Sequence, residues 1–177
     1  MKKELSKYDI QANEFLEKTN TEIKIVFKEY AKYFHTDKEP RDIYNITLIR
    51  GNRKYTFTFG NSLHNSGFYV QIGNIKHMLP RDKTDSKYLN YFIKNNINSN
   101  YIEKKDKIHY PVPPSPYDIL SCLEKYEYES FDDFCDEYAY DPDSRSAERI
   151  YNACREQYLQ LCSLYSEEEM EMLRDIQ

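Results

Sequence analysis

The sequence predicts an α+β protein: an N-terminal helix and a small antiparallel β-sheet with a hairpin, then a C-terminal bundle of short helices. Three observations support this fold class. Apolar and polar residues alternate along two stretches of the first 60 residues, a two-residue turn signal separates the arms of a hairpin, and helix-capping patterns recur after residue 114. The 177 residues are enough for one domain or two very small ones.

The first elements are a helix and a strand. A loose helical stripe over residues 6–18 ends near Asn20. From residue 21 to 30 the pattern switches to alternation, which predicts a strand with one apolar face. The helical stripe consists of Tyr8, Ile10, Ala12, Phe15 and Leu16. The apolar face of the strand consists of Ile23, Ile25 and Phe27, and its other face consists mostly of Glu22, Lys24 and Lys28.

The hairpin over residues 42–59 is the clearest local signal. Gly51 and Asn52 suit a two-residue type II′ turn, which makes Arg50 and Arg53 the flanking pair. Counting back from the turn pairs Leu48 with Tyr55, Ile46 with Phe57 and Tyr44 with Phe59, all on one face. One register therefore satisfies both the turn and the hydrophobic pattern.

Residues 66–110 are predicted to be a basic insertion rich in Asn and Tyr. Within it, residues 68–72 have the composition of a further strand and residues 88–93 that of a short helix. The Pro-rich run at 110–116 is predicted to be an extended, fairly stiff connector that acts as a hinge. The expected organisation is thus 1–65 for the helix and sheet, 66–110 for the insertion and the start of the linker, and 111–177 for the acidic helices.

After the connector, the predicted helices are marked by their caps. Ser115 precedes a first-turn proline and Asp118, Ser130 pairs with Asp133, and Asp143 or Ser144 begins a longer helix. Ser166 and Glu169 form a capping box ahead of the last helix. The apolar stripe of the longer helix comprises Ala147, Ile150, Tyr151, Cys154, Tyr158, Leu161, Cys162 and Tyr165.

Charge is divided sharply along the chain. Residues 1–110 hold 20 Lys and Arg against 13 Asp and Glu, whereas residues 111–177 hold 5 against 17. The first part therefore has a net charge of +7 and the second a net charge of −12. This difference is informative about the surfaces and possible partners of the protein, and it does not predict the fold.

Several function classes are excluded or disfavoured. Four glycines leave no P-loop or dinucleotide-binding loop, and no nucleophile elbow surrounds any serine. An EF-hand aligned on Asp141 and Asp143 fails, because Arg145, Ser146 and Asn152 occupy its fifth, sixth and twelfth positions. The four cysteines lack metal-ligand spacing and are expected to be reduced, buried thiols. We therefore expect no catalytic residue, no metal and no cofactor.

Two surfaces are candidates for binding. Basic residues at the hairpin tip and in the insertion could neutralise phosphates of single-stranded nucleic acid, and an acidic cluster could meet a basic protein surface. Each also has an ordinary interpretation as a solvated, charged face. The basic candidates are Arg50, Arg53, Lys54, Lys104 and Lys105, and the acidic candidates are Asp132, Asp133, Asp136, Glu137, Asp141 and Asp143.

Two blocks of sequence carry a resemblance. The first includes Asp37-Lys38-Glu39-Pro40-Arg41-Asp42 and Phe57-Thr58-Phe59-Gly60-Asn61-Ser62. The second includes Pro116-Tyr117-Asp118, Phe131-x-Asp133-Phe134-Cys135 and Tyr140-Asp141-x-Asp143-Ser144-Arg145. Together they resemble a widespread family of small phage and prophage proteins over residues 13–65 and 111–177, with residues 66–110 departing from the pattern.

The resemblance implies a mobile-element origin and action in the cytoplasm of a bacterial host, and it supplies no catalytic residues. The expected function, by analogy with small acidic phage proteins, is non-enzymatic inhibition of a host defence nuclease complex such as a CRISPR effector. The alternative is an accessory protein that binds RNA or single-stranded DNA during phage replication or recombination. The expected partner is a host protein or ribonucleoprotein, and the short apolar runs and the charged N-terminus predict neither a membrane span nor a secretory signal.

Overall fold

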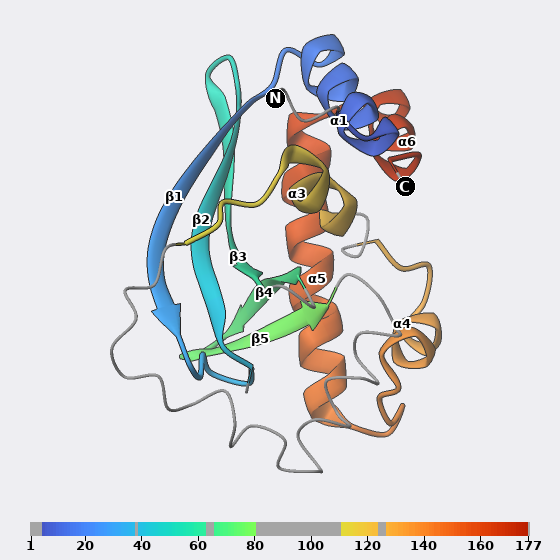
Figure 1. The fold of residues 1–177 in the computed structure, drawn as a ribbon. Coiled ribbons are helices and arrows are strands. Elements are labelled where there is room, and N and C mark those ends of the chain that lie inside the picture. The colour runs from blue at the N-terminus through green and yellow to red at the C-terminus, as the bar shows by residue number, and fades with distance from the viewer. Residues whose placement is uncertain (1–4, 38, 63–65, 81–110, 124–126, 177) are drawn as a thin grey trace, which may run out of the picture.

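The computed structural model describes residues 5–37, 39–62, 66–80, 111–123 and 127–176, and it confirms the α+β class (Figure 1). One antiparallel sheet has the strand order β1-β2-β3-β4-β5, so neighbours in sequence are neighbours in space. The strands are β1 (Glu22–Ala31), β2 (Arg41–Arg50), β3 (Arg53–Asn61), β4 (Ser66–Ile72) and β5 (Ile75–Pro80). The helices are α1 (Lys7–Lys18), α3 (Pro116–Leu123), α4 (Phe131–Tyr138), α5 (Arg145–Leu164) and α6 (Glu167–Arg174).

The helices lie on one side of the sheet and share a core with it. Helix α5 packs on β3 and β4, α3 packs on β4, and α1 and α6 both contact α3 (Figure 1). Side chains of the sheet, such as Ile46 and Phe68, belong to the same buried cluster as Leu120 of α3 and Leu161 of α5. The predicted helical part is therefore packed on the sheet, and the two parts have one hydrophobic core.

The hairpin of β2 and β3 has the predicted register at every pair, with Leu48 opposite Tyr55 and Arg50 opposite Arg53. Gly51 has a φ of 58°, as the first central residue of a type II′ turn requires. The inward side chains are buried. On the other face the hydroxyls of Thr47 and Thr56 form a hydrogen bond of 3.0 Å. The turn residues and the alternation of apolar side chains favour the same register, which is why the local sequence was sufficient to predict it.

The sheet continues across residue 65, where we expected its boundary. Strand β4 pairs with β3 from Asn61 opposite Ser66 to Thr58 opposite Tyr69, and β5 then pairs with β4 along its length. Phe68, Val70 and Leu79 are buried in the shared core. The strands β4 and β5 therefore belong to the same sheet as β1 to β3, so the sheet does not end at residue 65. The helix predicted at 88–93 lies outside the described residues.

The Pro-rich connector is attached to the sheet. The Val112 amide donates to Asp42 at 3.2 Å, and the Asn61 amide group donates to the Val112 carbonyl at 3.1 Å. Pro114 is buried. These contacts contradict the expected hinge, because the backbone amide and carbonyl of Val112 are both hydrogen-bonded to the sheet and Pro114 is buried.

The caps predicted after the connector are confirmed, and one residue predicted to be buried is exposed. Ser115, Ser130, Ser144 and Ser166 each accept a hydrogen bond from a backbone N–H three residues on, and Ser6, which was not predicted as a cap, does the same for α1. Helix α5, at 20 residues, is longer than the short helices expected. Cys162 is exposed although we placed it on the apolar stripe, because a step of eight residues from buried Cys154 rotates it about 80° away, whereas Leu161 stays in line.

Candidate interaction surfaces

The arginines of the hairpin tip contact the helices. Arg50 donates to the Leu164 carbonyl at 2.9 Å and to both carboxylate oxygens of Glu169, at 2.5 and 2.6 Å. Arg53 donates to the Ser163 carbonyl at 2.6 Å. The last carbonyls of a helix have no intrahelical donor, so the two guanidinium groups satisfy the C-terminal end of α5 and oppose its dipole.

Glu169 has two roles in this contact. Its carboxylate accepts from the Ser166 backbone N–H at 2.8 Å, which completes the predicted capping box of α6. The same carboxylate receives the bidentate bond from Arg50. The hydrogen bond from Arg50 is the main cause that lowers the pKa of Glu169 below its ordinary value of 4.5. The capping box is visible in the sequence, but the pairing with a residue 119 positions away is not.

This contact gives stability a pH dependence. A carboxyl group whose pKa is lowered by folding stabilises the folded state above its ordinary pKa and loses that contribution as the pH falls through the folded value. Glu169→Gln is expected to lower the free energy of unfolding by about 1–2 kcal/mol at pH 7. Because the wild-type contribution is lost below pH 4.5, the two proteins should converge in acid.

Urea unfolding followed by circular dichroism between neutral pH and pH 3 measures that convergence. Glu171→Gln is the matched control, since Glu171 is an exposed residue on the same helix. Parallel stability curves for wild type and Glu169→Gln would contradict the assigned role of the carboxylate.

The structure divides the predicted basic patch. Arg50 and Arg53 point toward the ends of α5 and α6, whereas Lys54 is exposed and occupies the opposite face of β3. That face also carries Lys24 and Lys76, and Lys76 donates to Thr58 at 2.9 Å. Lys104 and Lys105 lie outside the described residues. The cations nearest the turn therefore do not form one open phosphate-binding surface.

The predicted acidic residues come together at α4 and the segment that follows it. Asp132, Asp133 and Asp136 are exposed on α4, and Glu137 is half-buried. Asp141 and Asp143 are exposed before α5, where Asp141 accepts from the Asp143 backbone N–H at 3.0 Å. From Glu127 to Asp143 the chain has eight carboxylates and no Lys or Arg.

The thiol of Cys135 reports how closely three of these carboxylates approach. Burial raises its pKa first, and the negative charges of Asp132, Asp136 and Asp141 raise it further. Tyr140 lies beyond the end of α4 and its ring is 5.6 Å from that of Phe134, so the chain has turned back toward the helix after Ala139. Ala139 takes the left-handed conformation, with φ 55°, and closes the helix through its bond to the Cys135 carbonyl.

An aromatic cluster holds α4 in place. The ring of Phe134 lies 5.1 Å from that of Tyr128 and 5.6 Å from those of Tyr140 and Tyr151. The Tyr128 hydroxyl donates to the Tyr138 hydroxyl at 2.9 Å, and burial raises the pKa of Tyr140 to about 12. Because three rings pack around Phe134 on the buried face of α4, this packing holds the helix and its acidic face in place.

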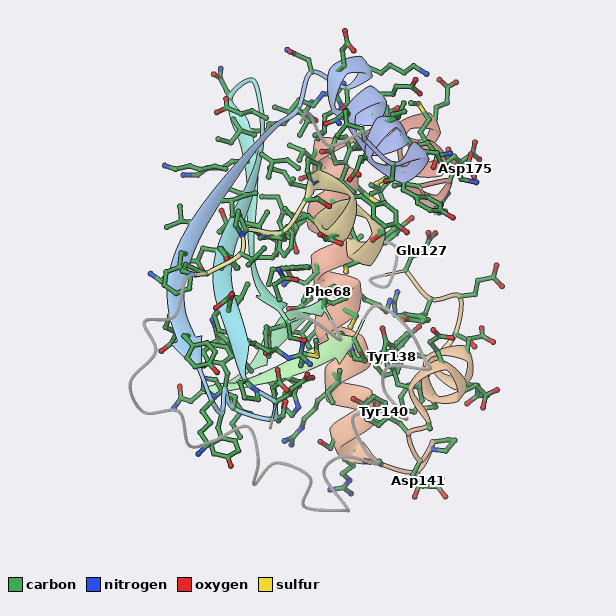
Figure 2. All side chains as sticks on the ribbon, viewed as in Figure 1. Phe68, Glu127, Tyr138, Tyr140, Asp141 and Asp175 are labelled. Atoms are coloured by element: carbon green, nitrogen blue, oxygen red, sulfur yellow. The ribbon has the colours of Figure 1, made fainter. Side chains whose placement is uncertain are left out.

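A second group of exposed acids lies at α6, apart from the acidic surface at α4 (Figure 1). Glu127 binds Arg174 and accepts from the Tyr158 hydroxyl at 2.9 Å, so this carboxylate is paired within the chain. Figure 2 shows Asp175, Glu127 and Asp141 following one another along the side of the molecule away from β1. The exposed acids of this side are Glu129, Asp132, Asp133, Asp136, Asp141 and Asp143 around α4, and Glu167, Glu168, Glu171 and Asp175 at α6.

The sequence did not reveal a buried ionic network on the other face of the sheet. Arg41 and Asp37 form an ion pair whose side chains are both 0% exposed. Glu39 binds the same guanidinium at 2.9 Å, and the Tyr69 hydroxyl donates to Asp37 at 2.6 Å. Phe34 packs with Tyr69 in the small apolar cluster beside it. The network therefore anchors the segment between β1 and β2, and the first block of the resemblance has a structural role here.

No group of three or more His, Cys, Asp or Glu side chains within the described parts of the chain is arranged to hold a metal ion. Comparison with protein-family models, curated proteins and solved structures gives no match. Among the helices of the described residues, none combines the length and the apolar character needed to cross a membrane.

Proposed function

We propose that the protein is a phage- or mobile-element-encoded, non-enzymatic inhibitor that binds a host defence nuclease complex, with a CRISPR effector as the first candidate. The observation that carries the proposal is the acidic surface at α4: exposed carboxylates of one sign on a helix fixed by aromatic packing. A nuclease groove that holds nucleic acid is basic, so such a surface is complementary to it.

Electrostatics supports a binding role for this surface. Like charges gathered at one place repel one another and cost stability, yet here a run of 17 residues has no cation of its own. The packing that holds α4 in place limits the entropy lost when a partner binds. An inhibitor of this kind associates quickly with its target and is sensitive to salt, because its attraction acts at long range.

The test is charge reversal at matched positions. Asp132→Lys with Asp136→Lys alters two exposed residues four apart on α4, and among the residues that the structure describes no hydrogen bond uses either carboxylate. We expect binding to a purified CRISPR effector, and inhibition of its DNA cleavage, to weaken at least about tenfold, since facing like charges are repulsive. Circular dichroism checks that the fold is retained.

The control is Glu167→Lys with Glu171→Lys, which makes the same change in net charge at the same spacing on α6. It should leave inhibition within about threefold of wild type, a difference worth less than 1 kcal/mol. Equal losses in both variants would indicate a nonspecific charge effect, and unchanged inhibition in the α4 variant would remove this surface from the interface. Measuring binding to the effector with and without its guide RNA identifies whether the protein binds the effector protein or the guide RNA.

The open face of the sheet supports a second candidate function, the binding of RNA or single-stranded DNA. Lys24 and Lys54 are exposed there beside Thr47 and Thr56, and the described helices leave the face uncovered. Lys24→Glu with Lys54→Glu would weaken such binding and reduce its salt dependence. Nucleic-acid binding that this variant loses and the α4 variant keeps would favour the second function.

A further inference from the structure

Strand β1 is an edge of the sheet. It pairs with β2 on one side, and the strand order of the described residues places no strand on its other side. Figure 1 shows β1 as an outer strand, away from α5. The outward backbone N–H and C=O groups of an edge strand can pair with another strand, and proteins usually protect such edges with charges, bulges or prolines.

The two halves of β1 differ in that protection. The pairing with β2 shifts between Phe27 and Glu29, so a bulge and the charges of Lys28 and Glu29 interrupt the second half. From Glu22 to Phe27 the pairing is unbroken. This first half carries four apolar side chains in six residues, and two of them, Val26 and Phe27, are each 42% exposed.

The sequence of this half is complementary to itself when two copies run antiparallel about Ile25. Ile25 then faces Ile25 of the second copy, and Ile23 faces Phe27 of the second copy on the side that the helices cover. On the open side Val26 lies against the stem of Lys24 of the second copy. Glu22 at the end of the paired stretch comes close to Lys28 in the bulge of the second copy. A two-fold interface repeats this contact of opposite charges.

Neighbouring registers are less favourable. Pairing centred on Val26 would bring Lys24 opposite Lys28 of the second copy. Pairing centred on Lys24 would bring Lys24 opposite Lys24 of the second copy. A register centred between two residues is excluded, since residues directly opposite in an antiparallel pair must point to the same face. Like charges directly opposite one another in a sheet are destabilising, so charge selects the register about Ile25.

We propose that the protein forms a homodimer through residues 22–27 of β1, paired antiparallel about Ile25, so that the two five-stranded sheets become continuous. The exposed apolar side chains at the edge are covered by the same residues of the second copy. The contact is shorter than the interfaces of tight complexes, which places its dissociation constant in the range of about 1–100 µM. The inference is independent of the acidic surface, and its test needs no host partner.

Analytical ultracentrifugation of the full chain between about 1 and 300 µM measures the association. The weight-average mass should rise from 21.4 kDa toward twice that value. Val26→Lys places a lysine opposite Lys24 of the second copy at two points and should weaken the dimer at least about tenfold. Val26→Thr, which keeps a β-branched side chain, should retain it. A monomer throughout the range, or association unaffected by Val26→Lys, would overturn the proposal.

Cross-linking tests the register directly. In a Cys162→Ser background, which removes the exposed thiol of the described residues, Ile25→Cys should form an intermolecular disulfide on mild oxidation. Val26→Cys in the same background should not, because its neighbour in the second copy is Lys24. Equal cross-linking of the two variants, or none for Ile25→Cys, would refute pairing about Ile25.

Discussion

Arg41→Ala is expected to lower the free energy of unfolding by about 3–5 kcal/mol, the cost of removing one partner of a buried ion pair. The substitution leaves the Asp37 carboxylate fully buried without the guanidinium that compensates its charge. The Tyr69 hydroxyl and the Glu39 backbone N–H still donate to Asp37, but neither carries a charge. The apolar stem of Arg41 is lost as well, which leaves a cavity beneath the segment between β1 and β2.

Two comparison variants separate the ionic effect from general damage. Arg53→Ala removes an exposed arginine that donates to the Ser163 carbonyl, and it should cost less than about 1 kcal/mol. Asp37→Asn combined with Arg41→Met removes both fully buried charges and should recover at least half of the loss, since Glu39, which also loses the guanidinium, is partly exposed to solvent. Guanidinium unfolding followed by circular dichroism measures all three. A double variant no more stable than Arg41→Ala would argue against the ionic explanation.

Gly67→Ala is expected to destabilise the protein by about 3 kcal/mol or more, toward the upper end of the cost of overpacking. A Cβ at this position would lie 2.2 Å from the Leu79 carbonyl oxygen and 2.7 Å from the Met78 side chain. The Leu79 oxygen is backbone of the paired strand β5, so the clash cannot be relieved by a side-chain rotation. Either β5 separates from β4 or the sheet bends.

Gly73→Ala is the control for the removal of a glycine. Gly73 has a φ of 59° and no atom within 4 Å of the added Cβ, so its cost is only that of the left-handed conformation, about 1–2 kcal/mol. Thermal and urea unfolding should therefore rank Gly67→Ala clearly below Gly73→Ala in stability. Equal losses would mean that β5 moves freely, and the close approach of the two strands would not be a constraint.

The amount that could be predicted differs between elements for a physical reason. The β2–β3 hairpin was predicted residue by residue because its turn and its alternation are set by residues close in sequence. The serine caps of α3, α4 and α6 were predicted for the same reason, with Ser144 one of two candidates at α5, since each bond spans three residues. Strand β5 was missed: residues 75–80 have no clear alternation, and their strand character comes from pairing with β4.

The candidate surfaces show the same division. The acids predicted at α4 lie together there, and Asp132, Asp133 and Asp136 are exposed. The predicted basic patch is divided, because Arg50 and Arg53 are bonded to the helices while Lys54 is exposed on the other face. The sequence could not show that Arg50 would be bound by Glu169, or that Asp37, Arg41 and Tyr69 would form a buried network. Those partners are 119 and 32 positions apart in the two longest cases, beyond any local pattern.

The sequence by itself determined the α+β class, the hairpin register, the helix caps and the division of charge, because local periodicity and composition control each of them. The tertiary structure alone decided that the helices and the sheet share one core, that the connector is bonded to the sheet, and which charges stay exposed. Whether a charged side chain serves the fold or faces a partner depends on what the packed chain places within hydrogen-bond distance. That distance is set only when the helices have closed over the sheet.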